Sequence, residues 1–240
     1  SSQLVLEALI FHIQGRSCLA QATQTLAQAQ AMVWSLSDPQ YASYTEAKRQ
    51  QRLALATFYY ATNGDNWENN QSWLSYEVDE CFWYSHTPVG ETSICNDNGE
   101  CVSLSLSYNK LSGYIPSELA KLPMLQTIKL EGNLLASAIP NELADLSNLE
   151  LLNLADNHLG GYIPSELGNL PTLQNMELEG NLLTGSIPKE LGDLSNLEML
   201  NLADNYLGGN IPWELANLPM LHSMELGGNL ITGSIPNELA

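Results

Sequence analysis

Cysteine and histidine side chains form the densest group of residues in this chain that could do chemistry. Cys81, Cys95 and Cys101 lie in one short stretch with His86 among them, and Cys18 stands far upstream. Three thiols and an imidazole could bind zinc, but their spacing lacks the C-x₂-C pairs that tetrahedral zinc sites usually have. We therefore favour disulfides, which indicate an oxidising compartment.

Catalytic motifs are missing from the rest of the sequence. The four histidines are scattered, and there is no H-E-x-x-H, no G-x-S-x-G and no glycine-rich phosphate loop. The segment Asp97–Glu100 has part of a calcium-loop sequence without the other ligands, so we interpret it as a turn. The sequence thus predicts no catalytic residue, no metal site and no cofactor, and a protein that is not an enzyme.

Charge and hydropathy disfavour further classes of partner. The chain has 27 acidic and 8 basic residues, a net charge of -19, which disfavours nucleic acid and anionic membranes. The most apolar stretch, residues 4–13, is shorter than the ~18–20 residues of a membrane span. Membrane attachment would need a segment outside residues 1–240. We expect the natural polypeptide to be longer, because the chain starts without Met and stops inside a repeat.

An asparagine recurs every 24 residues through the C-terminal part of the chain, with a leucine three residues before it and an apolar residue five before it. The segment before each asparagine therefore alternates with period two, as a short strand does. Stacked copies would form a parallel sheet over one shared core, which makes the predicted fold an α/β solenoid. We interpret the asparagines as structural, since their amides can bond backbone groups that the turn leaves unpaired. They are Asn109, Asn133, Asn157, Asn181, Asn205 and Asn229.

These repeats resemble the plant-type leucine-rich repeat, L-x-x-L-x-L-x-x-N-x-L-x-G-x-I-P, over residues 104–240. Ile-Pro follows every asparagine, and glycine stands in the G position except in the second repeat, where Ser137 replaces it. The resemblance implies a right-handed superhelix with a parallel sheet on its concave face, and extra short strands and 3₁₀ turns on its convex side. It also implies that the inner or lateral face binds peptides, small ligands or other proteins.

The residues before the repeats divide into two predicted segments. Residues 1–57 are predicted to be helical, because residues 19–36 keep a helical period that Ser37-Asp38-Pro39 ends, and a second helix should start near Thr45. Residues 58–103 resemble the N-terminal cap of the same repeat family. The resemblance is closest to the leucine-rich-repeat proteins of diatom-type algae, which are commonly predicted to be secreted or membrane-anchored.

The cap resemblance also has consequences for the cysteines. It implies a disulfide between Cys81 and Cys95, and Cys18 would then pair with Cys101 and tie the helices to the cap. Asn70 begins an N-glycosylation sequon, which is consistent with export.

Strand residues that point away from the core are where a partner would bind. They include six acids and one lysine, so we expect either a merely solvated face or attraction to a partner with a basic surface. Tyrosines near Ile-Pro and the ladder asparagine indicate a second, lateral surface. The candidate ligand-binding residues are Lys129, Glu131, Asp156, Glu177, Glu179, Asp204 and Glu225 on the sheet, and Tyr114, Tyr162 and Tyr206 on the lateral side.

Two functions fit this sequence. The first is a non-catalytic recognition or adhesion module, secreted or at the cell surface, that binds a protein, peptide or glycan through its concave or lateral face. The second is a structural or accessory subunit packed permanently in a larger complex.

Overall fold

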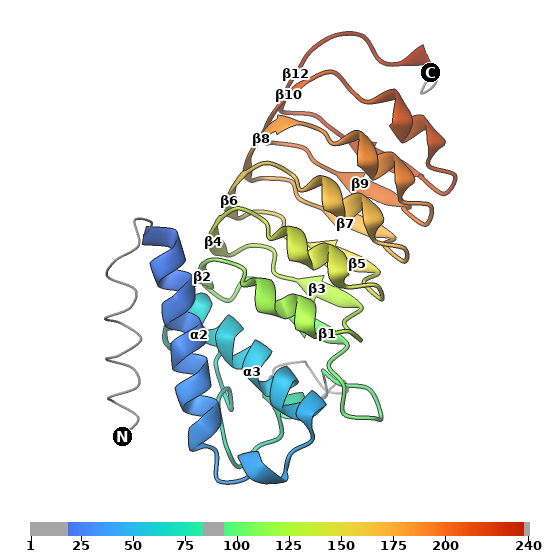
Figure 1. Ribbon diagram of the computed structural model, residues 1–240. Helices are drawn as coiled ribbons and strands as arrows, with labels where there is room; N and C mark the ends of the chain where they lie inside the picture. The colour runs from blue at the N-terminus through green and yellow to red at the C-terminus, as the bar shows by residue number, and fades with distance from the viewer. Residues whose placement is uncertain (1–18, 84–93, 238–240) are drawn as a thin grey trace.

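The computed structural model of the protein describes residues 19–83 and 94–237. Residues 4–13, Cys18 and His86 lie outside these parts, and so do the predictions that depend on them. Figure 1 shows a stack of similar coils with two helices packed at its N-terminal base.

The two helices of the base are α2 (Leu19–Ser37) and α3 (Glu46–Ala61). Thr45 caps α3, because its Oγ1 accepts a hydrogen bond of 3.2 Å from the Lys48 N–H, one of the donors that a first helical turn leaves free. α3 continues across the boundary expected between residues 57 and 58, since its buried face includes Phe58 and Tyr59. The helical segment and the cap are therefore one packed unit.

Six short parallel strands form the first sheet in chain order. They are β1 (Ser103–Ser105), β3 (Thr127–Lys129), β5 (Leu151–Asn153), β7 (Asn175–Glu177), β9 (Met199–Asn201) and β11 (Ser223–Glu225). The middle residue of every strand but the last is buried. Each residue pairs with the one 24 positions later, as Leu104 does with Ile128. The predicted sheet, with one strand from each repeat, is confirmed.

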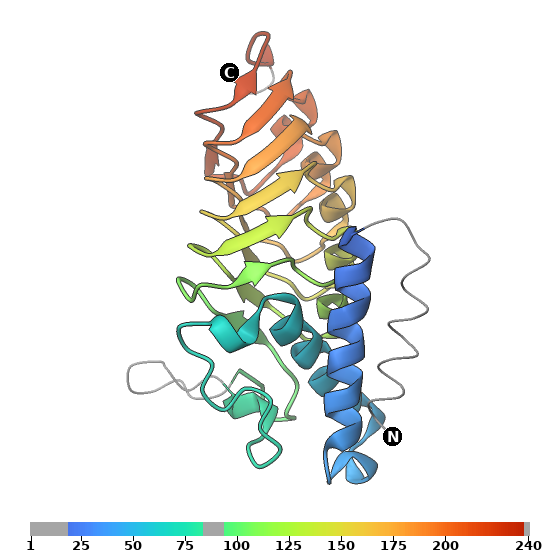
Figure 2. The same ribbon diagram turned by 90° about the vertical axis from the view of Figure 1, so that its left-hand side faces the viewer.

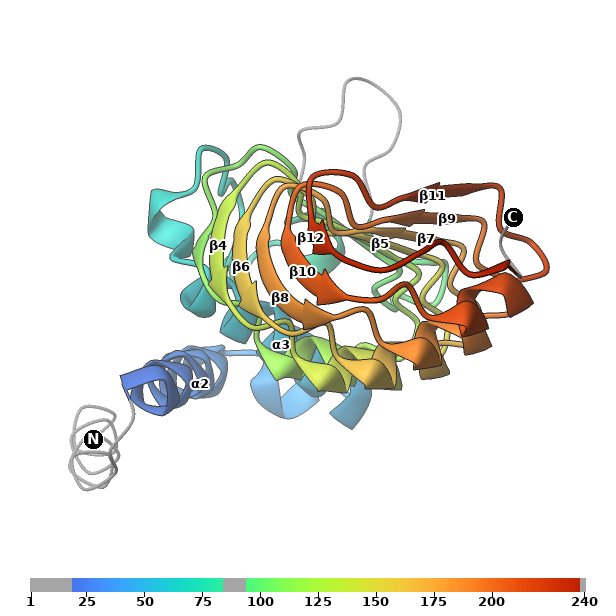
Figure 3. The same ribbon diagram turned by 90° about the horizontal axis from the view of Figure 1, so that it is seen from above.

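A second parallel sheet of six strands runs along another side of the stack. Its strands are β2 (Ser112–Gly113), β4 (Leu134–Ser137), β6 (His158–Gly161), β8 (Leu182–Ser186), β10 (Tyr206–Gly209) and β12 (Leu230–Ile231). Paired residues are fewer positions apart here than in the first sheet. Ala136 pairs with His158 and Gly160 pairs with Leu182, in each case 22 positions later in the sequence. Figure 3, seen along the stack, shows the two sheets on different sides of each coil. The extra strands implied by the family resemblance are therefore present.

The free edge of β2 is covered by the end of α3. The Ser112 N–H donates to the Thr62 carbonyl at 3.1 Å, and the Tyr114 N–H donates to the Ala61 carbonyl at 3.2 Å. Gly113 lies between them with φ +100°, and a Cβ there would sit 2.2 Å from the Ala61 oxygen, so only glycine fits this contact. The helix end thus protects an edge that could otherwise template association.

Short 3₁₀ turns fill the remaining side of each coil (Figure 3). Those of the repeats are η4 (Ser117–Lys121), η5 (Asn141–Asp145), η6 (Ser165–Asn169), η7 (Lys189–Asp193) and η8 (Trp213–Asn217). The base adds η1 (Tyr41–Ser43), η2 (Gly64–Asn66) and η3 (Glu80–Phe82). Each repeat turn starts directly after the proline of Ile-Pro, whose backbone is extended, as in Pro164 with φ -62° and ψ 127°.

One hydrophobic core runs from the base through the stack. The ladder asparagines other than Asn229 are buried beside it, and Asn157 is typical. Its Nδ2 donates to the carbonyls of Leu130, Leu154 and Ala155 at 2.9, 3.1 and 3.0 Å, and its Oδ1 accepts from the Leu135 N–H at 3.0 Å. The amide therefore bonds backbone groups of two successive coils and holds them in register.

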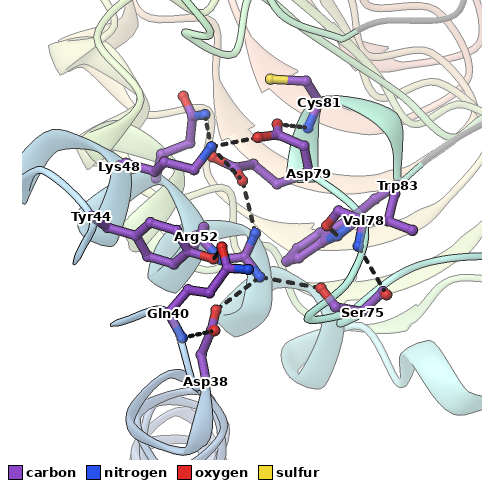
Figure 4. Close-up of polar contacts among 12 residues, drawn as sticks. Asp38, Gln40, Tyr44, Lys48, Arg52, Ser75, Val78, Asp79, Cys81 and Trp83 are labelled. Carbon is purple, nitrogen blue, oxygen red and sulfur yellow. Dashed lines mark hydrogen bonds and ion pairs between the residues drawn. The ribbon is translucent and has the colours of Figure 1, made fainter. Parts of the chain in front are cut away.

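A buried ion network ties the helices to the cap (Figure 4). The Arg52 guanidinium contacts the Glu80 carboxylate at 2.9 Å and the Asp38 carboxylate at 3.2 Å, and Arg52 is 2% exposed. The rings of Trp34 and Trp83 enclose it, with their centres 5.2 and 5.1 Å from the guanidinium carbon. Two carboxylates thus pair a charge that would be very unfavourable to bury alone.

The cysteines of the cap differ from one another. Cys81 and Cys95 form a disulfide, the pairing that the resemblance implied. Cys101 instead carries a free thiol in this structure. The expected bridge between Cys101 and Cys18 depends on Cys18, which lies outside the described residues. The core encloses Cys101, which is 1% exposed, and its Sγ lies 3.7 Å from the Ser103 carbonyl oxygen.

The segment Asp97–Glu100 is a turn, as its sequence predicts. Its geometry comes from Asn96, whose Oδ1 accepts hydrogen bonds of 3.0 Å from both the Asn98 and the Glu100 N–H.

Candidate ligand-binding face

The outer side of the first sheet brings the predicted acidic residues together. We call it the acidic face and define it by Lys129, Glu131, Asn153, Glu177, Glu179, Asn201 and Glu225. The register places Lys129, Asn153 and Glu177 side by side on β3, β5 and β7, and it continues through Asn201 to Glu225. Charged and amide side chains therefore alternate from coil to coil along this row.

The carboxylates at the centre of the acidic face are half-buried. Burial, and then the charge of Glu131, raise the pKa of Glu177 above its ordinary 4.5, although Lys129 acts in the opposite direction. Burial is also the first cause of the raised pKa of Glu179, to which the charges of Glu177 and Asp156 add. Repulsion between the carboxylates therefore contributes to both pKa shifts, but loss of water contributes more.

Two carboxylate oxygens of the acidic face are buried without a hydrogen-bond partner, Glu131 Oε2 and Glu179 Oε2. Asn153 Nδ2 donates to Glu177 Oε2 at 3.1 Å. Within the described residues, no ion pair neutralises any of these three glutamates. A buried acceptor without a donor is unfavourable, so this face can accept donors from a partner.

Asp156 and Asp204 lie at the rim of this sheet, each directly before a ladder asparagine and each with φ +51°. Both lean over the next coil, because a Cβ on Gly180 would lie 2.4 Å from Asp156 Oδ1, and one on Gly228 would lie 2.0 Å from Asp204 Oδ1. These two carboxylates therefore pack against backbone while they stay exposed to solvent.

The three tyrosines expected on the lateral side do not form one patch. Tyr114 is covered by α2, since its hydroxyl donates to the Thr23 carbonyl at 3.3 Å, and burial followed by the charge of Glu118 raises its pKa. Figure 2 shows α2 alongside the first coils. The contact with Thr23 leaves Tyr114 half-buried. Tyr162 and Tyr206 remain 71% and 54% exposed.

A row of exposed side chains lies on the second sheet, and of its members only Tyr206 was among the candidates expected from the sequence. Its members share the position directly after the ladder asparagine: Leu134, His158, Leu182, Tyr206 and Leu230. The residue that follows, such as Leu135 or Leu159, is buried. The period-two alternation of a strand thus resumes after the asparagine, and this was the signal that could have found the row.

Asn70, the predicted glycosylation site, is half-buried, and its Nδ2 donates to the Gly64 carbonyl at 3.1 Å. Attachment of a glycan at this nitrogen would have to replace that hydrogen bond. Glycosylation of Asn70 stays a prediction.

Metal-binding clusters and membrane-spanning helices are both absent from the described parts of the chain. Residues 19–83 and 94–237 contain no group of three or more His, Cys, Asp or Glu side chains placed to hold a metal ion. In the same ranges, no helix has the length and apolar character that crossing a membrane requires.

Comparisons with known proteins agree with this geometry. The family described as Leucine Rich Repeat matches residues 101–122, 148–170, 172–194 and 196–218. Phytosulfokine receptor 1 of Arabidopsis thaliana is 34% identical over 91 residues, which are 38% of this chain and 8% of the receptor. The chain therefore spans less than a tenth of the length of this curated relative.

Solved structures show the same repeat. The Arabidopsis receptor kinase HAESA, in complex with the peptide hormone IDA and the co-receptor SERK1, matches with a TM-score of 0.57 and 29% identity over 82% of this chain and 36% of that one. The leucine-rich-repeat ectodomain of the receptor kinase SOBIR1 from Arabidopsis thaliana matches with a TM-score of 0.53 and 30% identity over 56% of this chain and 74% of that one. From its repeats, its two sheets and these relatives, the chain belongs to the plant-type leucine-rich-repeat proteins.

Proposed function

We propose that this chain is a non-catalytic recognition module, extracellular or at the cell surface, that binds a peptide or protein with basic groups on its acidic face. The observation that carries the proposal is the pair of buried, unpartnered carboxylate oxygens of Glu131 and Glu179. They lie beside Glu177, and burial together with the charge of Glu131 raises the pKa of Glu177. Within the described residues, no lysine or arginine of the protein forms an ion pair with Glu131 or Glu179. A lysine or arginine side chain would supply both the charge and the missing hydrogen bonds.

Similar structures support a peptide or protein partner. HAESA was solved with a peptide hormone and a co-receptor, and the plant receptor RGFR1, 36% identical over 57% of this chain, was solved with the peptide RGF2. The disulfide of the cap fits an oxidising, extracellular location. We also keep the closer kinship with the diatom-type algal proteins as a proposal.

The proposal carries a pH dependence. The raised pKa values of Glu177 and Glu179 mean that these carboxylates take up protons at a higher pH than the ordinary 4.5. Since only the charged form attracts a cation, binding should weaken as the pH falls and should do so before ordinary carboxylates titrate.

The test uses a fluorescent decalysine peptide as the probe and measures its anisotropy at increasing salt. We expect Glu177→Gln with Glu225→Gln to weaken binding several-fold and to flatten the salt dependence, because both charges lie in one row of the acidic face. The matched control is Glu142→Gln with Glu166→Gln, which removes the same charge from exposed positions on η5 and η6. Equal losses in the two double variants would show that only net charge matters and would refute the proposal.

A second candidate, a subunit packed in a larger complex, is favoured by one observation. Leu26, Met32 and Leu36 of α2 are 40%, 43% and 60% exposed, an apolar surface that a partner could cover. Size-exclusion chromatography of the isolated chain separates the two ideas. A soluble monomer supports recognition, and obligate co-purification with a partner supports the subunit.

A further inference from the structure

Three cysteines of the cap are connected to one another by a disulfide and a backbone pairing. Cys81 and Cys95 form the disulfide, and Cys95 is also paired with Cys101 in an antiparallel bridge. The hydrogen bonds of this bridge flank the pair, from the Val102 N–H to the Ile94 carbonyl at 2.8 Å and from the Asn96 N–H to the Glu100 carbonyl at 2.9 Å. Cys95 and Cys101 are thus the narrow, non-hydrogen-bonded kind of pair.

That kind of pair brings two side chains onto the same face of the ladder. The Cα atoms of a narrow antiparallel pair lie about 4.5 Å apart. Disulfides span Cα distances of roughly 4.4–6.8 Å, so the separation of Cys95 and Cys101 is compatible with a bond between them. Cys101 therefore faces Cys95, the residue that holds one sulfur of the existing disulfide.

We propose that Cys101 is an internal exchange partner, so that the bridge can move from Cys81–Cys95 to Cys95–Cys101. The Cys101 thiol loses its proton, and its thiolate attacks the sulfur of Cys95. The Cys81–Cys95 bond breaks, Cys81 leaves as a thiolate, and that thiolate takes up a proton. One disulfide and one thiol are present before and after, so the step needs neither an oxidant nor a reductant.

Several features hold the resting isomer at Cys81–Cys95. Burial, with a smaller contribution from the charge of Glu80, raises the pKa of the Cys101 thiol to about 12, so little thiolate is present near neutral pH. The other charged groups nearby are Lys48 and Arg52, which pair with Glu80, and Glu100, which precedes Cys101 in the chain. The resting bridge also closes a loop of 14 residues, a stronger constraint on the unfolded chain than the short loop between Cys95 and Cys101.

Exchange would loosen a defined part of the cap. Gln51 joins the two sides, since its Oε1 accepts from the Cys101 N–H at 2.7 Å and its Nε2 donates to Glu80 Oε1 at 2.9 Å. Cys81 follows Glu80 in η3 and Cys101 leads into β1, the first strand of the ligand-binding sheet. Moving the disulfide would leave η3 without its covalent link to Cys95. The new disulfide would instead join Cys95 to Cys101, next to β1. The cap thus contains a switch that thiol chemistry can set.

Disulfide mapping tests the proposal on the whole chain. Cleavage after glutamate places Cys18, Cys81, Cys95 and Cys101 in four separate peptides, namely residues 8–46, 81–91, 92–100 and 101–118. The folded protein is incubated at stepwise higher pH, quenched with acid, alkylated and digested, while circular dichroism monitors the fold. We expect the Cys95–Cys101 peptide pair to appear at a rate that rises about tenfold per pH unit, because only the thiolate attacks.

Two variants make the result decisive. In Cys81→Ser, mild oxidation should link Cys95 to Cys101 at a rate independent of protein concentration. In Cys101→Ser, the Cys81–Cys95 pair should persist at every pH at which the fold is intact. Alkylation of Cys101 without any change in linkage, or failure of Cys81→Ser to form the Cys95–Cys101 bond, would overturn the proposal.

Discussion

The N-terminal base and the stack of repeats are held together by different interactions. Within the described residues, every ion pair joins side chains between Asp38 and Lys110, and every pair of contacting aromatic rings lies between Trp34 and Trp83. The repeats use buried leucines and neutral amides that recur in each coil. An interaction that recurs between every two successive coils has to involve residues present in each repeat. The base occurs once in the chain, so it can be stabilised by charged side chains whose arrangement is found nowhere else.

The largest expected effect is at the centre of the base. Arg52→Leu leaves the buried carboxylates of Asp38 and Glu80 without their cation, which should destabilise the base by roughly 3–5 kcal/mol. Four of the five tryptophans lie in the base and Trp213 lies in the repeats. In a Trp213→Phe background, tryptophan fluorescence during urea unfolding therefore reports the base, and far-ultraviolet circular dichroism reports the whole chain.

The matched control removes an exposed ion pair from the same region. Lys110 contacts Glu68 at 3.3 Å, but both side chains are more than half exposed. Lys110→Ala should therefore cost about 1 kcal/mol or less. If both substitutions had equal effects, burial of the Arg52 network would not be what holds the base together.

The second prediction concerns the ladder. Asn157→Ala removes an amide that is 3% exposed and orphans backbone groups in two coils, at a cost of roughly 1–3 kcal/mol. Asn229 makes the same kinds of bonds in the last repeat but is partly exposed, so water can replace it and Asn229→Ala should cost less. Urea unfolding followed by circular dichroism measures both, and an equal cost at both positions would show that burial does not set the strength of the ladder.

The smallest effect is expected at Ser137, the residue that departs from the glycine of the repeat. Its φ is +79°, a conformation that is unfavourable for a residue with a side chain. Ser137→Gly should stabilise the stack by about 0.5–1 kcal/mol after the entropy of glycine is counted. The reverse change, Gly209→Ser at φ +75°, should destabilise it by a similar amount, since its Cβ would meet only Ser186 at 3.4 Å. The midpoint of thermal unfolding measures the stability of both variants. A loss of stability in Ser137→Gly would show that the backbone of Ser137 is not strained.

The contrast also explains what could be predicted from the sequence. The first sheet and its outward residues follow from a period that six asparagines repeat. The contacts of the base have no period. In the sequence, Asp38 is recognisable only as part of the signal that ends a helix, although in the structure it forms an ion pair with Arg52. Nothing in the sequence around Arg52 indicates that its side chain is buried.

The candidate site was predictable to the same extent. Glu131, Glu177 and Glu179 could be placed on one face, because their positions in the repeat are fixed. The cover that α2 provides for Tyr114 could not be found, since it depends on how a helix far away in the chain packs against the first coil. The dominance of burial over repulsion at Glu177 likewise depends on neighbouring side chains that a repeat pattern does not describe.

The unequal registers of the two sheets affect how any partner could follow the stack. On the first sheet, equivalent residues of successive coils lie directly opposite each other, so a ligand parallel to the stacking axis meets the same position in every coil. On the second sheet, paired residues are 22 positions apart in the sequence, whereas equivalent residues of successive coils are 24 positions apart. Equivalent residues are therefore displaced by two residues along the strand from one coil to the next, or about 6.6 Å per coil. The second sheet is sheared, and the exposed row from Leu134 to Leu230 runs obliquely across its strands. A partner that contacts this row has to cross the coils on a slant.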